Sequence, residues 1–288
     1  MAWNRHVLSK WDEAGIADGD TSKIIELPQG LYSAIYMRLS GTGGAGTPAV
    51  DDLIATIKVK TDKGYIFDMR SADCLILARA LTGRKPTITN ATGAYTETNQ
   101  TLYFGRKPRD KALMLDIRSS NVRQVELTFG TLIASTAFAT GTVKLTVTVD
   151  EWVGNPPPEL RGFISTKVVE DKATGTGKTV FDLFKGNKLA GILVTIGTIT
   201  TVRQVRVGTD KIPDLFGVMN FRDLVNLHNA ENNVDTAETL NALWEMPSLS
   251  ENLDQLPNLN EPNTDYNVEL ERGTTTTTSR LNQLDVVS

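Results

Sequence analysis

The sequence is poor in the residues that carry most catalytic and metal-binding chemistry. Cys74 is the only cysteine, so no disulfide can form within the chain and thiolate metal clusters are excluded. The two histidines, His6 and His228, lie far apart in the sequence, and neither adjoins a pair of carboxylates. Because catalytic metal sites need clustered histidines and carboxylates, we expect no metal-dependent oxidation.

An excess of basic charge and long apolar runs are also missing. The net charge of −4 and the pI near 5.4 argue against direct binding to nucleic acid, which requires a basic stripe. The longest uncharged stretch, residues 127–143, contains Thr, Ser and Gly throughout. It predicts two strands and a turn, since a membrane span needs ~20 mostly apolar residues. The first residues show no apolar run of a secretion signal, so no leader is expected.

Two glycine-rich segments imitate nucleotide-binding motifs, and we interpret both as loops. Residues 41–46 fit G-x-G-x-x-G, but the following sequence soon returns to strand, whereas a dinucleotide site needs a βαβ unit. Residues 175–179 resemble the end of a phosphate-binding loop, but Lys172 stands where the first glycine is required. The Gly-x-Ser-x-Gly motif of a serine nucleophile is missing as well. We therefore predict no enzyme activity, no catalytic residues and no cofactor.

Acidic pairs provide the remaining candidates for a metal. Asp18 and Asp20 flank a glycine, and Asp51 is followed by Asp52. Such pairs could contribute to a calcium site, but they are typical of solvated acidic turns. A structural calcium ion is therefore not indicated, and we assign no metal ligands.

The sequence does contain two related copies of one β-rich unit. Four positions of the first copy recur 156 residues later: Leu27, Gly30, Ala34 and Gly41 return as Leu183, Gly186, Ala190 and Gly197. Residues 57–63 recur at 205–211 with an offset of 148, and residues 125–131 recur at 268–274 with an offset of 143. The offsets shrink along the chain while the order is kept, which is typical of a duplicated fold after loop deletions.

The pattern within each copy predicts short strands and one helix. Residues 142–149 alternate between apolar and polar almost throughout and are rich in β-branched side chains, as in a half-buried strand. Apolar residues at helical spacing predict a short helix in each copy: Cys74, Leu77, Ala78 and Leu81 in the first, and Phe221, Leu224, Val225 and His228 in the second. About eight short strands per copy favour an all-β fold of two sandwiches or jelly rolls.

Four segments follow from these patterns. Residues 1–20 form an N-terminal arm or helix, residues 21–154 the first jelly-roll barrel, residues 155–162 a Pro-rich linker, and residues 163–288 the second barrel. Residues 229–263, rich in Asn and Pro, are interpreted as a long surface insertion. Loops at 41–51, 85–100 and 229–263 are expected to carry specific contacts.

Trp3, Val7 and Trp11 are the residues of the N-terminal segment with candidate functional roles. They recur every four residues, which would place them on one face of a short helix. This helix either packs on the body of the protein or forms an arm that reaches a neighbouring subunit or a membrane surface.

The order of these segments resembles a known family. The pattern consists of Leu-Pro-x-Gly at 27–30, Arg-Leu-Ser-Gly at 38–41, Ile-Lys-Val-Lys at 57–60 before a Thr-Asp turn, a helix, Tyr-Phe-Gly-Arg at 103–106, and an Ala-Thr-Gly-Thr strand ending at 150–151. Together with the second copy, it is similar to the double jelly-roll major capsid proteins of membrane-containing icosahedral viruses, the corticovirus and tectivirus lineage. The resemblance covers about residues 21–288.

This resemblance implies two tandem eight-stranded jelly-roll barrels, each with a short inserted helix. It also implies a structural subunit of a bacterial or archaeal virus that forms a homotrimer of pseudo-hexameric outline. The implied partners are neighbouring capsomers, penton and minor capsid proteins and the inner viral membrane, without direct contact to nucleic acid. The protein would be located in the virion after assembly in the host cytoplasm.

An alternative function is a virion spike or a lectin-like, two-domain β-sandwich that binds a carbohydrate or a receptor. Such sites usually need aromatic side chains clustered on loops. Here the aromatic residues are scattered along the sequence, among them Tyr95, Tyr103, Trp152 and Trp244.

Overall fold

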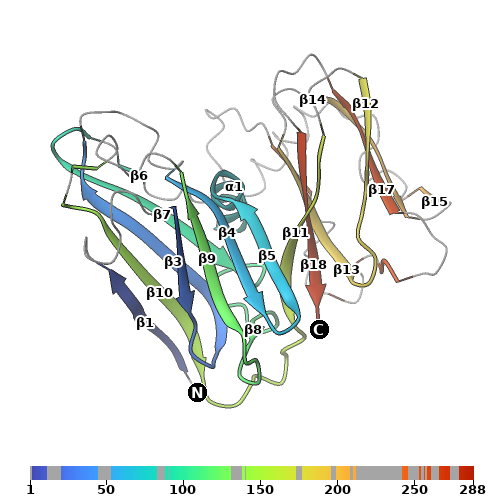
Figure 1. The fold of residues 1–288 in the computed structure, drawn as a ribbon. Helices are drawn as coiled ribbons and strands as arrows, with labels where there is room; N and C mark the ends of the chain where they lie inside the picture. Colours follow the sequence, from blue (N-terminus) through green and yellow to red (C-terminus); the bar gives the residue numbers. More distant parts are fainter. Residues whose placement is uncertain are drawn as a thin grey trace. The chain divides into compact units, whose positions relative to one another are not determined.

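The computed structural model describes two compact units, residues 1–164 with Ser288, and residues 165–287. The described residues are 2–11, 21–44, 53–82, 88–89, 91–130, 138–139, 141–172, 177–195, 199–207, 210–211, 242–245, 253, 256, 258–260, 266–272 and 279–288. Each unit is described by itself below (Figure 1).

The first unit contains two antiparallel sheets. One has the order β1 (Ala2–Trp11), β10 (Lys144–Val153), β3 (Leu31–Thr42), β7 (Tyr95–Tyr103) and β6 (Ile88–Thr89), and β8 (Leu115–Asp116) also pairs with β3. The other has the order β5 (Gly64–Arg70), β4 (Ile54–Thr61), β9 (Arg123–Phe129) and β2 (Ser22–Glu26). Figure 1 shows the two sheets facing each other, with α1 (Ser71–Thr82) beside them.

The strand order identifies the first unit as a jelly roll. The eight principal strands are, in chain order, β1, β2, β3, β4, β5, β7, β9 and β10. Counted in that order, they form one sheet with the sequence 1-8-3-6 and another with 5-4-7-2. This pattern of two Greek keys places the first strand beside the last one, and it is the topology of the eight-stranded jelly roll.

The second unit repeats the same topology. Its strands are β11 (Phe163–Lys172), β12 (Gly177–Asp182), β13 (Lys188–Thr195), β14 (Ile199–Val207), β15 (Asp210–Lys211), β16 (Ala242–Glu245), β17 (Tyr266–Arg272) and β18 (Ser279–Val287). One sheet has the order β16-β13-β18-β11 and the other β12-β17-β14-β15. Counted in chain order, these are again 6-3-8-1 and 2-7-4-5, so the prediction of two tandem jelly rolls is confirmed.

The sequence repeat corresponds to equivalent strands in the two units. Residues 57–61 and 205–207 lie in β4 and β14, the fourth principal strands of the two units, and residues 125–127 and 268–270 lie in β9 and β17. Leu27 and Leu183, which open the repeat, are both buried. The helix predicted at Cys74–Leu81 is confirmed as α1, whereas its counterpart at 221–228 lies outside the described residues.

The prediction of a helix within residues 1–20 is wrong for Ala2–Trp11. These residues form β1, which pairs with β10 from Ala2 opposite Val153 to Trp11 opposite Leu145. A spacing of four residues fits both structures, because residues i and i+4 share a face in a helix and also in a strand. The segment is therefore the first strand of the first jelly roll, which begins before residue 21.

Two predicted loops also contain structure. Within 229–263, residues 242–245 form β16, and Leu256 and Leu259 are buried rather than exposed; most other residues of this insertion lie outside the described part. Within 85–100, residues 95–100 belong to β7. Residues 45–51 of the loop predicted at 41–51 are not described.

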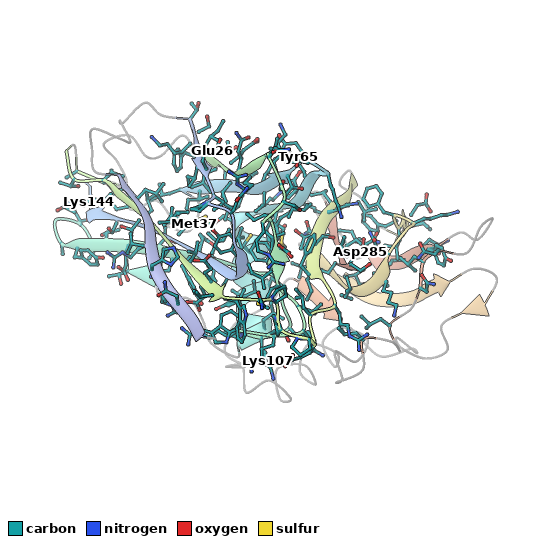
Figure 2. All side chains as sticks on the ribbon, turned by 90° about the horizontal axis from the view of Figure 1, so that it is seen from below. Glu26, Met37, Tyr65, Lys107, Lys144 and Asp285 are labelled. Atoms are coloured by element: carbon teal, nitrogen blue, oxygen red, sulfur yellow. The ribbon has the colours of Figure 1, made fainter. Side chains whose placement is uncertain are left out.

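The inner face of β7 is polar, in contrast to the strand beside it. Thr96, Thr98 and Gln100 have no exposed surface, and they pair with Gly41, Leu39 and Met37 of β3. Figure 2 shows Met37 in the interior of the first unit. The amide nitrogen and oxygen of Gln100 are buried and have no hydrogen-bond partner within the described part of the chain. Leaving such groups unpaired costs about 1–3 kcal/mol.

We predict that Gln100→Met raises the free energy of unfolding by about 1–3 kcal/mol, because the thioether fills similar space without an unpaired amide. Urea denaturation followed by tryptophan fluorescence measures this. Gln124→Met is the matched control, since the Gln124 amide donates a 2.6 Å hydrogen bond to Glu26 at the surface. A loss of stability in Gln100→Met larger than that of the control would contradict the prediction.

Candidate interaction surface

One face of the β1-β10-β3 sheet gathers aromatic and charged side chains. Register places Trp3 opposite Trp152, Arg5 opposite Asp150, and Asp150 opposite Ala34. The loop after β7 adds cations next to them. We call this group the Arg5 surface; it consists of Trp3, Arg5, Val7, Tyr36, Arg109, Lys111, Asp150 and Trp152.

The centre of the Arg5 surface is an ion pair between β1 and β10. Arg5 Nε donates to Asp150 Oδ1 at 2.6 Å, and Arg5 Nη2 donates to Asp150 Oδ2 at 2.7 Å. This fork geometry gives two charge-assisted hydrogen bonds at once. The Asp150 side chain is fully buried, whereas 52% of the Arg5 side chain is exposed, so the guanidinium group shields the carboxylate and still faces solvent.

Tyr36 on β3 contacts both members of this ion pair. Its hydroxyl donates to Asp150 Oδ2 at 3.0 Å, and the Arg5 guanidinium carbon lies 4.6 Å from the centre of the Tyr36 ring. Burial raises the pKa of Tyr36 well above its ordinary value. The phenol therefore remains protonated at neutral pH and remains a donor to the carboxylate.

The loop after β7 brings a second arginine to the same carboxylate. Arg109 Nε lies 3.4 Å from Asp150 Oδ2, and its backbone N–H donates to Ser33 Oγ at 2.7 Å. Ser33 is the residue that the β3–β10 register skips. Asp110, which is 2% exposed, fixes the loop by accepting hydrogen bonds from Arg106 Nε at 2.8 Å and from the Ala112 N–H at 3.0 Å.

The surroundings keep Asp150 ionised. Burial alone would raise the pKa of this carboxyl group, but the hydrogen bonds from Arg5, Tyr36 and Arg109 outweigh burial and hold its pKa below the ordinary value. Asp150 is therefore charged at neutral pH and binds Arg5 as a carboxylate.

Two tryptophans continue the surface at the end of β1. The rings of Trp3 and Trp152 meet edge to face, with centroids 5.1 Å apart and planes at 81°. Trp152 is buried against Leu31 and Met114, and its indole N–H donates to the Asn155 carbonyl at 2.8 Å. Lys111 Nζ lies 5.5 Å from the Trp152 ring, which is within the range of a cation–π contact.

The structure brings two of the three predicted site residues together. Trp3 and Val7 are four residues apart on β1 and share a face, and 47% of Val7 is exposed. Trp11 lies opposite Leu145, beyond a register shift between Val7 and Ser9. Contact of these residues with a membrane or with a neighbouring subunit stays a prediction.

The sequence interpretation missed the charged part of this surface. Arg5 stands between Trp3 and Val7 at strand parity, so a strand assignment would have placed it beside them. Asp150 and Trp152 share the parity of Thr146 and Thr148 at the end of the strand that the sequence predicts there. No sequence pattern indicated that Arg109 belongs to this surface, because its position depends on the loop that Asp110 fixes.

No group of three His, Cys, Asp or Glu residues is placed to hold a metal ion in the part of the chain that the structure describes. Likewise, none of the described helices has the length and apolarity needed to cross a membrane.

The double jelly-roll fold is shared with solved viral capsid proteins, as the sequence pattern predicted. The major capsid protein P2 of bacteriophage PM2 matches with a TM-score of 0.68 and 15% identity, over 100% of this chain and 98% of that protein. The STIV MCP matches with a TM-score of 0.65 and 11% identity, over 99% and 96% of the two chains. The Faustovirus major capsid protein matches with a TM-score of 0.56 and 7% identity, over 100% and 91%.

The likeness lies in the fold and not in the sequence. No family model matches the sequence, and no curated protein matches it. The alternative of a virion spike or a lectin-like module gains no support from the similar structures.

We predict that Arg5→Met lowers the free energy of unfolding by about 1–3 kcal/mol, because it leaves a buried carboxylate without its two strongest hydrogen bonds. The matched control is Arg118→Met, which breaks a similar two-bonded pair with Asp116 in which 41% and 39% of the side chains are exposed. Exposed pairs contribute about 0–1 kcal/mol. Equal losses in urea denaturation of the two variants would contradict a special role for Arg5.

The lowered pKa of Asp150 also predicts a pH dependence. A carboxyl group whose pKa is lower in the folded protein adds stability above its unfolded value of 3.8, and this stability is lost as the pH falls through the folded value. The stability difference between the unmodified protein and Asp150→Asn should therefore be large at about pH 7 and shrink below about pH 4. Unfolding curves at several pH values measure this stability difference. A difference that does not change with pH would refute the conclusion that the pKa of Asp150 is lowered in the folded protein.

Proposed function

We propose that this protein is a major capsid protein, a structural subunit that builds the shell of an icosahedral virus around an inner membrane. The observation that carries the proposal is the duplication of one eight-stranded jelly roll within a single chain. The match with the PM2 capsid protein over 100% and 98% of the two chains supports it, because neither protein has a large part without a counterpart in the other.

The duplication has a geometric use in such a shell. Three chains that each contribute two similar lobes give an assembly of threefold symmetry with six lobes, and such an outline packs among six neighbours. We therefore expect a homotrimer whose outer contacts are with neighbouring capsomers and with penton and minor capsid proteins. The role is structural rather than catalytic, and the protein is located in the virion.

The domain plan is part of the proposal. The first barrel extends to about residue 154, residues 155–162 form the linker, and residues 163–288 form the second barrel. Residues on β1, including Trp3 and Val7, are candidates for contact with a neighbour or with the inner membrane. Genome contact is not part of this role, in agreement with the net charge of −4.

Light scattering after size-exclusion chromatography should give a mass of three times the 31.5 kDa of the chain. An obligate assembly of this kind is expected to bury more than about 2,000 Å² at each interface, so the trimer should persist at micromolar concentration. Negative-stain electron micrographs should show a particle with six lobes. A stable monomer under these conditions would refute the proposed function.

A further inference from the structure

A cavity of about 440 Å³ lies beside β8 in the first unit. Three segments supply most of its lining: residues 61–66 at the β4–β5 turn, residues 114–120 around β8, and residues 160–163 before β11. All three belong to the first unit, and Figure 1 shows β8 close to the β4–β5 turn. The volume is within the range of pockets that hold small molecules.

Backbone hydrogen bonds hold the walls of this cavity in place. The Arg161 N–H donates to the Ala112 carbonyl at 2.8 Å, and the Met114 N–H donates to the Gly162 carbonyl at 2.7 Å. Gly162 has a φ of 143°, a conformation that a residue with a side chain rarely adopts. A ligand would therefore enter a formed cavity and would not have to order its walls.

The lining includes several apolar side chains. Met114 and Ile117 are at most 1% exposed, and Leu160 packs against the cluster that contains Met114. The apolar residues of the lining are Ile66, Met114, Leu115, Ile117, Leu160 and Phe163. An alkyl chain in this cavity would lose its contact with water, which favours binding.

Two cations at the cavity have no ion partner. Lys63 lies in the β4–β5 turn and Arg161 in the segment before β11, and both are exposed residues that line the cavity. Neither side chain forms an ion pair with any residue that the structure describes. Their charges therefore remain available to a ligand.

The two carboxylates at the same cavity are already occupied. Asp62 accepts hydrogen bonds from the N–H groups of Asn121 and Val122, both at 2.7 Å, and these bonds hold its pKa below the ordinary value. Asp116 accepts from Arg118 Nε at 2.9 Å and from Arg118 Nη2 at 2.6 Å. The charges without a partner are thus positive, and a ligand of complementary charge is an anion.

We propose that this cavity binds a single-chain amphiphile with an anionic head. The alkyl chain lies along the apolar lining, and the carboxylate or phosphate head pairs with Lys63 and Arg161. A fatty acid and a phospholipid with one chain share this chemistry. The inference goes beyond the proposed function and does not depend on it, because the cavity lies within one unit of one chain.

Isothermal titration of the full chain with sodium octanoate, below its micelle concentration, tests the binding. Saturable binding of one octanoate per chain is expected, and each methylene added from hexanoate to octanoate should tighten binding about threefold. Octyl phosphate in place of octanoate distinguishes a phospholipid head from a fatty acid, and tighter binding of either supports the inference. Octylammonium or octanol binding as tightly as both anions would overturn it, and so would a failure of both anions to bind.

The double variant Lys63→Gln, Arg161→Gln tests the two cations. It should weaken octanoate binding about tenfold, because it removes both charged donors to the head. The matched control is Lys107→Gln, Lys144→Gln, which removes two exposed cations of the first unit that do not line the cavity; Figure 2 labels both positions. Equal weakening in the two double variants would overturn the inference.

Methyl NMR of the full chain labelled with ¹³C-methyl methionine locates the ligand. Met114 lines the cavity, whereas Met37 and Met69 are buried elsewhere, so octanoate should shift the Met114 signal and leave the other two in place. Met114→Leu assigns the signal. An unchanged Met114 signal, or equal shifts of all three, would overturn the inference. A monomer that binds octanoate would refute the proposed function and leave this site intact, whereas a trimer that does not bind it would do the reverse.

Discussion

The pairing of β1 with β10 is the interaction on which the first unit depends. It joins the first principal strand of the jelly roll to the last, from Ala2 opposite Val153 to Trp11 opposite Leu145. Backbone hydrogen bonds alone would permit other registers, and a shift by one residue would turn each side chain to the other face. Two side-chain contacts oppose such a shift: the fork between Arg5 and Asp150, and the edge-to-face contact between Trp3 and Trp152. The same contacts that hold the register also build the Arg5 surface.

Each copy of the fold contains a buried carboxyl group near a skipped residue in the register, and the two pKa values are shifted in opposite directions. Asp150 on β10 lies opposite Ala34, where the register skips Ser33, and Asp285 on β18 lies opposite Leu189, where the register skips Ala190. Asp150 has two arginines and a tyrosine hydroxyl, which lower its pKa. Asp285 accepts a hydrogen bond from the Gln283 amide at 2.8 Å, and its burial raises its pKa.

Patterns in the sequence were sufficient to predict the architecture but not the Arg5 surface. The repeated segments around Leu27 and Leu183 predicted the duplication, because the same residues recur in the same order. The spacing from Cys74 to Leu81 predicted α1, because a helix face has a local periodicity. Residues 95–100 of β7 were interpreted as part of a loop because Thr96, Thr98 and Gln100 face inward, so the usual alternation of apolar and polar residues is absent there. The meeting of Arg5, Tyr36, Arg109 and Asp150 depends on strand order and register across the whole unit, which no local pattern encodes.

The place of β1 in the topology has a consequence for biosynthesis. A ribosome makes Ala2 long before its sheet partner Val153, which follows only after most of the first unit has emerged. Contacts of such long sequence separation are slow to form, so the nascent chain carries an unpaired edge and apolar inner faces throughout this interval. The first lobe can close once residue 153 has left the exit tunnel, before translation of the second lobe is complete, because domains generally fold as units during synthesis. The two lobes can thus fold one after the other. This order limits the time in which strands of the two similar lobes can pair wrongly with each other.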